Sequence, residues 1–209
     1  MRLRNVKNKE TIMANSEYLV INPTLYKGKW HTLFNNDNPI YLEIGMGKGQ
    51  FLINNALRYP DINFIGIEKY DSVIARAIEH IPLNLPNIKV VRVNAMEVDN
   101  IFLKEITILF LNFSDPWPKN RQENRRLTSK VFLDKYKDIF LNNQNIIQKT
   151  DNRQLFEYSL IEFSKSNYKI EEISLDLHHS EIADNIMTEF EEKFAKEGKP
   201  IYRVVVTKE

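Results

Sequence analysis

The stretch IYLEIGMGKGQFL, residues 40–52, contains the pattern that decides the fold. Its first part, residues 40–45, is an apolar run typical of a short buried strand, and residues 50–59 have the apolar spacing of a helix that Pro60 ends. Between them, three glycines at alternate positions permit positive φ and let a ligand approach the backbone closely. The stretch therefore predicts a strand, a ligand-binding turn and a helix, in that order.

The alternation of strands and helices continues along the rest of the chain, with no internal repeat, low-complexity block or linker. Further strands are expected at residues 63–68, 88–94, 106–113, 145–149, 169–177 and 201–208, and further helices at residues 71–81, 129–140, 153–166 and 186–198. Asp71 and Thr128 are expected to cap their helices, and Gly198 to end the last one. This alternation predicts an α/β fold with a mostly parallel, seven-stranded sheet covered by helices on both faces.

The composition fits one domain over residues 1–209, because 43% of the residues are apolar and nothing marks a boundary. Residues 1–15 are basic, and we expect them to be flexible on their own. No apolar run approaches the roughly eighteen residues of a membrane span, and no signal peptide is recognisable. With no cysteine and only four histidines, the chain predicts a cytoplasmic protein without a metal. Both a monomer and a homodimer stay open.

Polar residues follow four of the expected strands. They are Glu43 with the glycine turn, Glu68, Asn94 and Asp115. Ligands of parallel sheets bind beyond the carboxyl ends of the strands, near the point where the strand order switches. We therefore expect these residues to lie along one edge of the sheet.

The residues around the glycine turn discriminate between three kinds of cofactor site. A phosphate-binding P-loop needs Ser or Thr after Gly-Lys, but Lys48 is followed by Gly49. A dinucleotide fingerprint needs a glycine three residues after Gly47, where this chain has Gln50. The acid-x-Gly-x-Gly turn of S-adenosylmethionine-dependent methyltransferases matches, with Glu43 as the acid. A carboxylate there favours the sulfonium and ammonium charges of that cofactor.

The remaining residues of the expected cofactor site follow from this interpretation. Gly45 and Gly47 would lie against the cofactor. Glu68 comes 21 residues after Gly47, at a strand end where a carboxylate can accept hydrogen bonds from both ribose hydroxyls. Asn94 and Ala95 follow the next strand, where an amide can contact the adenine edge, although Asn94 is equally typical of a turn.

FSDPWPKNRQENRRLT, residues 113–128, follows the most apolar of the expected strands. Prolines on both sides of Trp117 fix φ and restrict the residues before them, so the turn that carries Asp115 is expected to be rigid. Trp117 offers either a stacking face or a plug for the core. Residues 119–130 contain five cations and one acid, which favours a site for a polyanion.

These motifs resemble those of the bacterial TrmB-type tRNA (guanine-N7-)-methyltransferases. The resemblance extends over nearly the whole chain, through YKGKW (26–30), EIGMGKGQFL (43–52), FIGIE (64–68), LNFSDPWPK (111–119), RRLT (125–128), KTDN (149–152), LFEYSL (155–160), NIMTEFEEKF (185–194) and GKPIYR (198–203). The segment 111–128 and the pair KTDN and TEFE are specific to this family, whereas the glycine turn alone is not.

The resemblance implies a Rossmann-like class I methyltransferase fold and transfer of a methyl group from S-adenosylmethionine to N7 of a tRNA guanine, at position 46 in the variable loop, with S-adenosylhomocysteine as product. It implies that Glu43, Glu68, Asn94 and Asp115 line the cofactor site and that Asp115 is catalytic. It assigns substrate binding to Lys119, Asp151, Thr188, Glu189, Phe190 and Glu191, and RNA contact to Arg121, Gln122, Glu123, Asn124, Arg125 and Arg126.

From the residues alone, two of these assignments have purely structural alternatives. Asp151 is equally suited to cap a helix, and Thr188 and Glu191 are suited to a solvated acidic helix face. The chain also departs from the family, which often has cations at Gln122 and Asn124, Asp at position 94 and Tyr at position 190.

Three rival functions stay open. They are methyl transfer to an exocyclic amine of a base or to a protein glutamine, RNA binding without catalysis, and nicotinamide-dependent oxidoreduction. The intact Glu43, glycine turn and Glu68 disfavour the second rival, and Gln50 disfavours the third.

Overall fold

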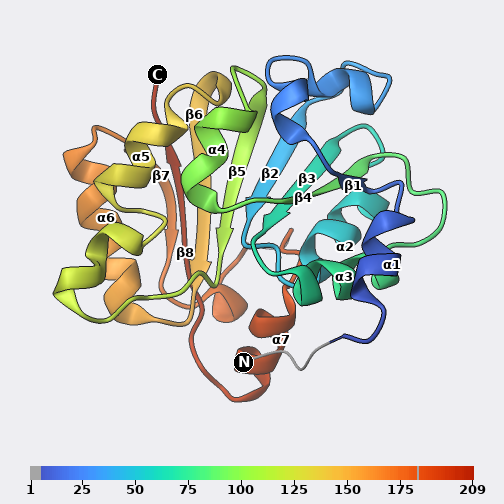
Figure 1. The fold of residues 1–209 in the computed structure, drawn as a ribbon. Helices are drawn as coiled ribbons and strands as arrows, with labels where there is room; N and C mark the ends of the chain where they lie inside the picture. Colours follow the sequence, from blue (N-terminus) through green and yellow to red (C-terminus); the bar gives the residue numbers. More distant parts are fainter. Residues whose placement is uncertain (1–5, 183) are drawn as a thin grey trace.

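The chain folds around one sheet with the strand order β1-β4-β3-β2-β5-β6-β8-β7 (Figure 1). The computed structural model describes residues 6–182 and 184–209. The strands are β1 (Leu19–Val20), β2 (Ile40–Ile44), β3 (Asn63–Glu68), β4 (Ile88–Arg92), β5 (Ile106–Asn112), β6 (Phe140–Thr150), β7 (Lys169–Ser174) and β8 (Tyr202–Thr207). Strands β1 to β6 pair in parallel, and β8 pairs antiparallel with both β6 and β7.

The predicted α/β class and its mostly parallel sheet are confirmed, with one addition. Strand β1 is an eighth strand of two residues, in which Leu19 lies opposite Val90 of β4. Two residues are too few to produce a recognisable alternation in a sequence. Strand β6 is also longer than the expected 145–149, because it begins at Phe140.

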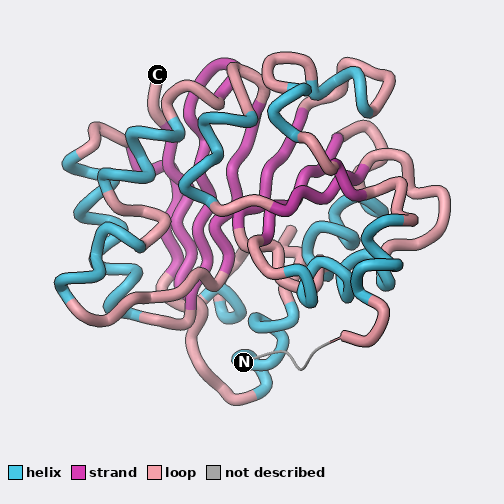
Figure 2. The backbone as a smooth tube through the Cα atoms, viewed as in Figure 1, coloured by secondary structure: helices cyan, strands magenta, loops and turns pink. Residues whose placement is uncertain are grey.

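Helices cover both faces of this sheet, as Figures 1 and 2 show. They are α1 (Lys9–Ala14), α2 (Gln50–Arg58), α3 (Asp71–His80), α4 (Val98–Ile101), α5 (Lys130–Tyr136), α6 (Arg153–Lys165) and α7 (Glu189–Lys196). Helix α1 packs against α3, so the basic segment expected to be flexible is helical from Lys9 onward. Residues 1–5 of that segment lie outside the described residues. Helix α7 lies beyond the carboxyl ends of the central strands (Figure 1).

The core consists of two hydrophobic clusters, one on each face of the sheet. Along β3, Phe64 belongs to the cluster beneath α2 and α3, whereas Ile65 and Ile67 belong to the cluster beneath α4, α5 and α6. Side chains of a strand point alternately to opposite faces, so a strand that is covered on both faces must be apolar throughout. This explains why the central strands have continuous apolar sequences.

Gly66 in β3 brings the glycine turn close to the sheet. A Cβ atom at Gly66 would lie 2.3 Å from Sδ of Met46 and 2.8 Å from Cδ2 of Leu52. Both neighbours come from the turn and the first part of α2, so a larger residue at this position would displace these side chains. The glycine in β3 therefore lets the turn and the start of α2 pack closely against the sheet.

Two predicted helix caps are wrong. Asp71 is the first residue inside α3 rather than its cap, and it forms an ion pair with Arg92. Helix α5 is preceded by Ser129, while the hydroxyl of Thr128 is buried 2.7 Å from the Ser159 hydroxyl. A residue beside a helix start can therefore be used for tertiary contacts instead of capping.

The end of the last helix agrees with the sequence. Gly198 has φ +69°, in the left-handed region that glycine adopts after a helix, and α7 ends at Lys196. The alternative role of Asp151 as a cap is wrong, because the side chain of Asn152 accepts the hydrogen bond from Leu155 N–H at 2.8 Å and so caps α6.

Candidate cofactor and nucleic-acid site

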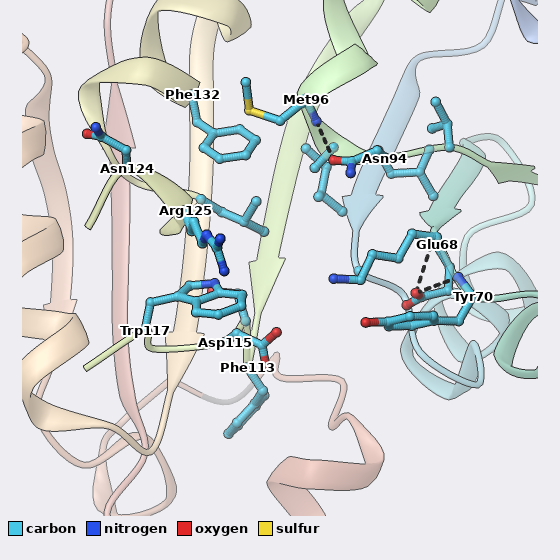
Figure 3. A pocket seen from close by; sticks show the side chains of 18 residues that line it. Glu68, Tyr70, Asn94, Met96, Phe113, Asp115, Trp117, Asn124, Arg125 and Phe132 are labelled. Carbon is cyan, nitrogen blue, oxygen red and sulfur yellow. Dashed lines mark hydrogen bonds between the residues drawn. The ribbon is translucent and has the colours of Figure 1, made fainter. Parts of the chain in front are cut away.

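A cavity of about 510 Å³ opens at the carboxyl ends of the central strands, where the strand order switches between β2 and β5. Figure 3 shows Glu68 and Tyr70 on one wall, and Asp115, Trp117 and Arg125 on the other. Its lining also includes Gly45, Asn94 and Ala95. Residues from four separate sequence motifs thus surround one space, as expected for strand ends of a parallel sheet.

The glycine turn leaves open space above its backbone. Gly45, Gly47 and Gly49 all have positive φ, between +57° and +81°. The N–H groups of Gly45 and Met46 donate to the carbonyl of Ile67, at 2.9 and 3.2 Å, and so hold the turn on β3. A Cβ atom at Gly45 or Gly47 would meet nothing within 4 Å, so these two glycines are required by their φ and leave room for a ligand.

Glu68 ends β3 with its carboxylate in the large cavity. Its Oε1 accepts hydrogen bonds from the N–H groups of Lys69, at 2.8 Å, and Tyr70, at 3.2 Å (Figure 3). Burial raises the pKa of Glu68, and these backbone donors act in the opposite direction. The bonds fix the orientation of a carboxylate that is suited to accept hydrogen bonds from ribose hydroxyls.

Glu43 lies in a smaller adjoining cavity, which Gly45, Thr188 and Phe190 also line. It is 2% exposed, and its Oε1 accepts a hydrogen bond from Asn112 Nδ2 at 2.9 Å. Burial raises the pKa of Glu43 to about 7, although Asn112 and Lys149 lower it. Its Oε2 has no hydrogen-bond partner among the described residues. A buried oxygen of this kind is costly unless a donor reaches it, and the ammonium of S-adenosylmethionine is a fitting donor.

Asn94 is a turn residue that also faces the large cavity. Its Oδ1 accepts the N–H of Met96 at 3.0 Å and caps the short 3₁₀ helix Ala95–Glu97, and the residue also lines the large cavity. Contact with an adenine edge stays a prediction for Asn94 and Ala95.

The turn that carries Asp115 contains two residues in left-handed backbone conformations. Phe113 has φ 48° and Trp117 has φ 43°, values that are uncommon for bulky residues. Trp117 is half-buried, lines the large cavity, and has the Arg125 guanidinium 4.9 Å from its ring centroid. The alternative of a core plug is therefore wrong, and Trp117 presents a face to the cavity.

The basic loop forms a 3₁₀ helix over Asn120–Arg125. Lys119, Arg121 and Arg125 are exposed, together with Glu123 and Asn124, whereas Gln122 is half-buried. Arg126 differs, because its Nε and Nη2 donate to the carbonyls of Pro116 and Trp117, at 3.1 and 3.0 Å. The structure therefore presents three of the four expected cations of this loop to solvent.

The start of α7 approaches the site from the C-terminal side. Thr188 and Glu191 form a capping box, in which Thr188 Oγ1 accepts the N–H of Glu191 at 3.0 Å. Glu191 is fully buried, and its Oε2 lies 2.6 Å from Nζ of Lys149. The solvated acidic face considered for Thr188 and Glu191 is therefore wrong, since both side chains are used inside the protein.

The neighbouring acids of α7 reach the glycine turn. Glu189 pairs with Lys48 at 2.9 Å, and Glu192 accepts a hydrogen bond from Gln50 Nε2 at 2.6 Å. Phe190 is 46% exposed and stacks beside Phe113, with centroids 6.4 Å apart. Asp151 is half-buried and lines neither cavity. Lys149 and Asn112 were not expected in this region, because nothing in a strand sequence indicates which polar residue faces a buried acid.

Within residues 6–182 and 184–209, no group of three or more His, Cys, Asp or Glu residues is arranged to hold a metal ion. In the same ranges, none of the helices has the length and apolar character to cross a bilayer.

This fold and site define a class I S-adenosylmethionine-dependent methyltransferase. Solved methyltransferases share the fold, among them an antibiotic-related methyltransferase (TM-score 0.65, 15% identity, 87% of this chain and 94% of that chain) and the 16S rRNA methyltransferase KamB (TM-score 0.63, 12% identity, 86% and 92%). A model of a family described as putative methyltransferase matches residues 37–204.

Relatives with much higher identity name the family. A tRNA (guanine-N(7)-)-methyltransferase of Bacillus licheniformis is 48% identical over 98% of this chain and 97% of its own length, and one of Oceanobacillus iheyensis is 50% identical over 97% of each. The chain belongs to the tRNA (guanine-N(7)-)-methyltransferase family, and its cofactor is S-adenosylmethionine.

Proposed function

We propose that this protein methylates N7 of guanine 46 in the variable loop of tRNA, in the bacterial cytoplasm. One observation carries the proposal: Glu68 and Asp115 face the same cavity, Arg125 lines it too, and Lys119 and Arg121 of the same segment are exposed. The cavity suits a nucleoside cofactor, and the cations suit a nucleic-acid backbone. Position 46 rests on the family resemblance of the motifs.

Each end of the cofactor has a fitting group. Glu43 would hold the ammonium, Glu68 the ribose hydroxyls, and Asn94 with Ala95 the adenine edge, while Gly45 and Gly47 let the ligand lie on the backbone. The bound cofactor supplies an activated methyl group.

Asp115 would orient the target and balance charge, without acting as a base. Guanine N7 carries an in-plane lone pair and no proton, so no residue is needed to create the nucleophile. Methylation makes the base cationic, and the nearby Asp115 carboxylate would offset this charge. The same carboxylate can accept hydrogen bonds from guanine N1–H and its exocyclic amine, or from the cofactor ammonium. Most of the rate enhancement would then come from proximity and orientation.

The tRNA would lie across the rim of the cavity. Lys119, Arg121 and Arg125 are available to phosphates, and Gln122, Glu123 and Asn124 share their 3₁₀ segment. At the other side, Thr188, Glu189 and Phe190 line the small cavity next to Glu43 and would contact the substrate from there. Asp151 and Glu191 line neither cavity and would act on substrate binding indirectly, Glu191 through its ion pair with Lys149.

The decisive experiment uses labelled S-adenosylmethionine and unmodified tRNA. We expect label in the tRNA and chain scission at position 46 under conditions specific for N7-methylguanine. A tRNA with adenine at position 46 serves as the control and should take up no label. Label without scission would indicate methylation of an exocyclic amine, and tRNA binding without label would indicate a binding protein.

A further inference from the structure

Arg126 is bound inside the protein in a way that its neighbours are not. Its Nε donates to the carbonyl of Pro116 at 3.1 Å, and its Nη2 donates to the carbonyl of Trp117 at 3.0 Å. Its guanidinium lies over the ring of Tyr158 in α6, with Cζ 4.2 Å from the centroid. Two hydrogen bonds and one cation–π contact fix the side chain between the turn and a helix.

The turn that Arg126 holds needs external support. Trp117 has φ 43°, and Phe113 at its other end has φ 48°. A bulky residue keeps such a conformation only where its surroundings over-determine it. The carbonyls that Arg126 binds belong to Pro116 and Trp117, the two residues directly after Asp115.

The side chain of Asp115 is not held in place by contacts with the described residues. The described residues make no hydrogen bond or ion pair to its carboxylate, and the residue is exposed at the cavity wall (Figure 3). Its position is therefore set by its backbone, and Arg126 is the side chain that binds the backbone after it.

We infer that Arg126 is a positioning residue for Asp115 rather than a phosphate contact. A guanidinium is a planar fork that can donate to two carbonyls at once while it stacks on an aromatic ring. A lysine keeps the charge but offers a single ammonium group that cannot reproduce this geometry. The inference rests on the proposed methyl transfer and gives the charge at position 126 a geometric purpose within this chain.

The adjacent arginine provides the contrast. The Arg125 guanidinium lies over the other side of the turn, against the Trp117 ring, and Arg125 is exposed. Arg121 is exposed as well. These two side chains are free to meet phosphates, whereas Arg126 would have to break its contacts with Pro116, Trp117 and Tyr158 to do so.

The test is a charge-preserving substitution, Arg126→Lys, with Arg121→Gln as a phosphate-contact variant and Arg153→Lys as a matched control. Arg153 is an exposed arginine of α6 that pairs with Glu157 and lines neither cavity. For each variant, kcat and KM for tRNA are measured, together with the salt dependence of tRNA binding and the thermal unfolding temperature.

We expect Arg126→Lys to lower kcat about 100-fold, because displacement of a catalytic group by about 1 Å has an effect of this order. Its salt dependence should equal that of the wild type. Arg121→Gln should reduce the slope of log K against log salt by about 0.7–0.9, and Arg153→Lys should change nothing. A wild-type kcat for Arg126→Lys overturns the inference. A further variant, Arg126→Gln, removes the charge, and a salt slope reduced as much as that of Arg121→Gln would also overturn it.

A second variant covers the case in which Arg126→Lys does not fold. Tyr158→Leu removes the surface under the guanidinium and leaves every charge in place, so it should lower kcat with KM for tRNA nearly unchanged. Tyr158→Phe keeps the ring and should restore kcat. Equal kcat values for the Leu and Phe variants contradict the inference. If the wild-type protein transfers no methyl group in the same assay, the proposed function fails instead.

Discussion

The two halves of the site hold their charges in opposite ways. In the cofactor half, at the ends of β2 and β3, Glu43 is buried with one carboxylate oxygen lacking a partner in the described chain. In the C-terminal half, at the end of β6 and the start of α7, Glu191 is equally buried but bonds to Lys149, Asn185 and the N–H of Thr188.

This difference separates a carboxylate kept for a ligand from one used for structure. Burial without enough partners raises the pKa of Glu43 to about 7, so near neutral pH the acid is only partly ionised until a cation reaches it. Burial also lowers the pKa of Lys149, while Glu191 acts in the opposite direction. The C-terminal half is thus internally neutralised, and the cofactor half is completed by its ligand.

The largest effect is expected from breaking the pair in the C-terminal half. Lys149→Ala leaves the Glu191 charge buried without its partner, which should cost about 3–5 kcal/mol of unfolding free energy in urea titrations. Lys48→Ala removes an ion pair in which the side chains are 28% and 40% exposed, and should cost less than about 1 kcal/mol. The double substitution Lys149→Met with Glu191→Leu should recover most of the loss. Equal losses for Lys149→Ala and Lys48→Ala would contradict the comparison.

The next effect concerns Asp115, at the boundary between the halves. Asp115→Asn keeps the shape but removes the charge, and we expect kcat to fall about 100-fold in single-turnover assays, since one electrostatic group contributes about this much. Cofactor affinity, measured by calorimetry on the same sample, should change much less. Turnover near that of the wild type would rule out charge compensation by Asp115.

In the cofactor half, a smaller effect is expected for the pH dependence of cofactor affinity. The ammonium of the cofactor needs ionised Glu43, so affinity for S-adenosylmethionine should rise between pH 6 and pH 8 and binding should release protons. Glu43→Gln should lower the affinity about tenfold at pH 8, equivalent to about 1.4 kcal/mol, and flatten its dependence on pH. An unchanged pH profile in this variant would show that another group titrates.

Glu43→Gln should also change how the stability of the folded, cofactor-free protein depends on pH, with the opposite sign to the pH dependence of cofactor affinity. The folded-state pKa of Glu43 lies above its ordinary value, so the stability that its protonated form contributes is present at low pH and is lost as pH rises through about 7. The cofactor-free Glu43→Gln protein should therefore lose less stability between pH 5 and pH 8 than the wild type. Thermal unfolding at these two pH values measures the difference.

The smallest effect per residue is expected at the rim. Changing Lys119, Arg121 and Arg125 to glutamine, singly and together, should weaken tRNA binding severalfold per side chain and reduce the salt dependence stepwise. Fold stability should stay constant because these side chains are exposed. A triple variant with the wild-type slope would place the RNA surface elsewhere.

Most of the sheet followed from local sequence. Strands β2 and β5 are largely apolar on both faces, and the glycine turn requires positive φ, so both features are visible in the residues themselves. The sequence also predicted that Glu68, Asn94 and Asp115 would meet, because strand ends of a parallel sheet share one edge.

The C-terminal half was predicted less well. The sequence predicts a helix over residues 186–198, which in the structure begins only at Glu189. It does not indicate that Glu191 turns inward toward Lys149, 42 residues earlier. Likewise, Arg126 stands in a run of cations and only its contacts with Pro116 and Trp117 distinguish it from Arg125.

The sequence alone determined the fold class, the cofactor turn and the acids that end the strands, because each depends on residues that are neighbours in the chain. The tertiary structure decided which charges face a ligand and which are paired inside the protein. That choice depends on desolvation and on partners from distant segments, and a side chain carries no local mark of either.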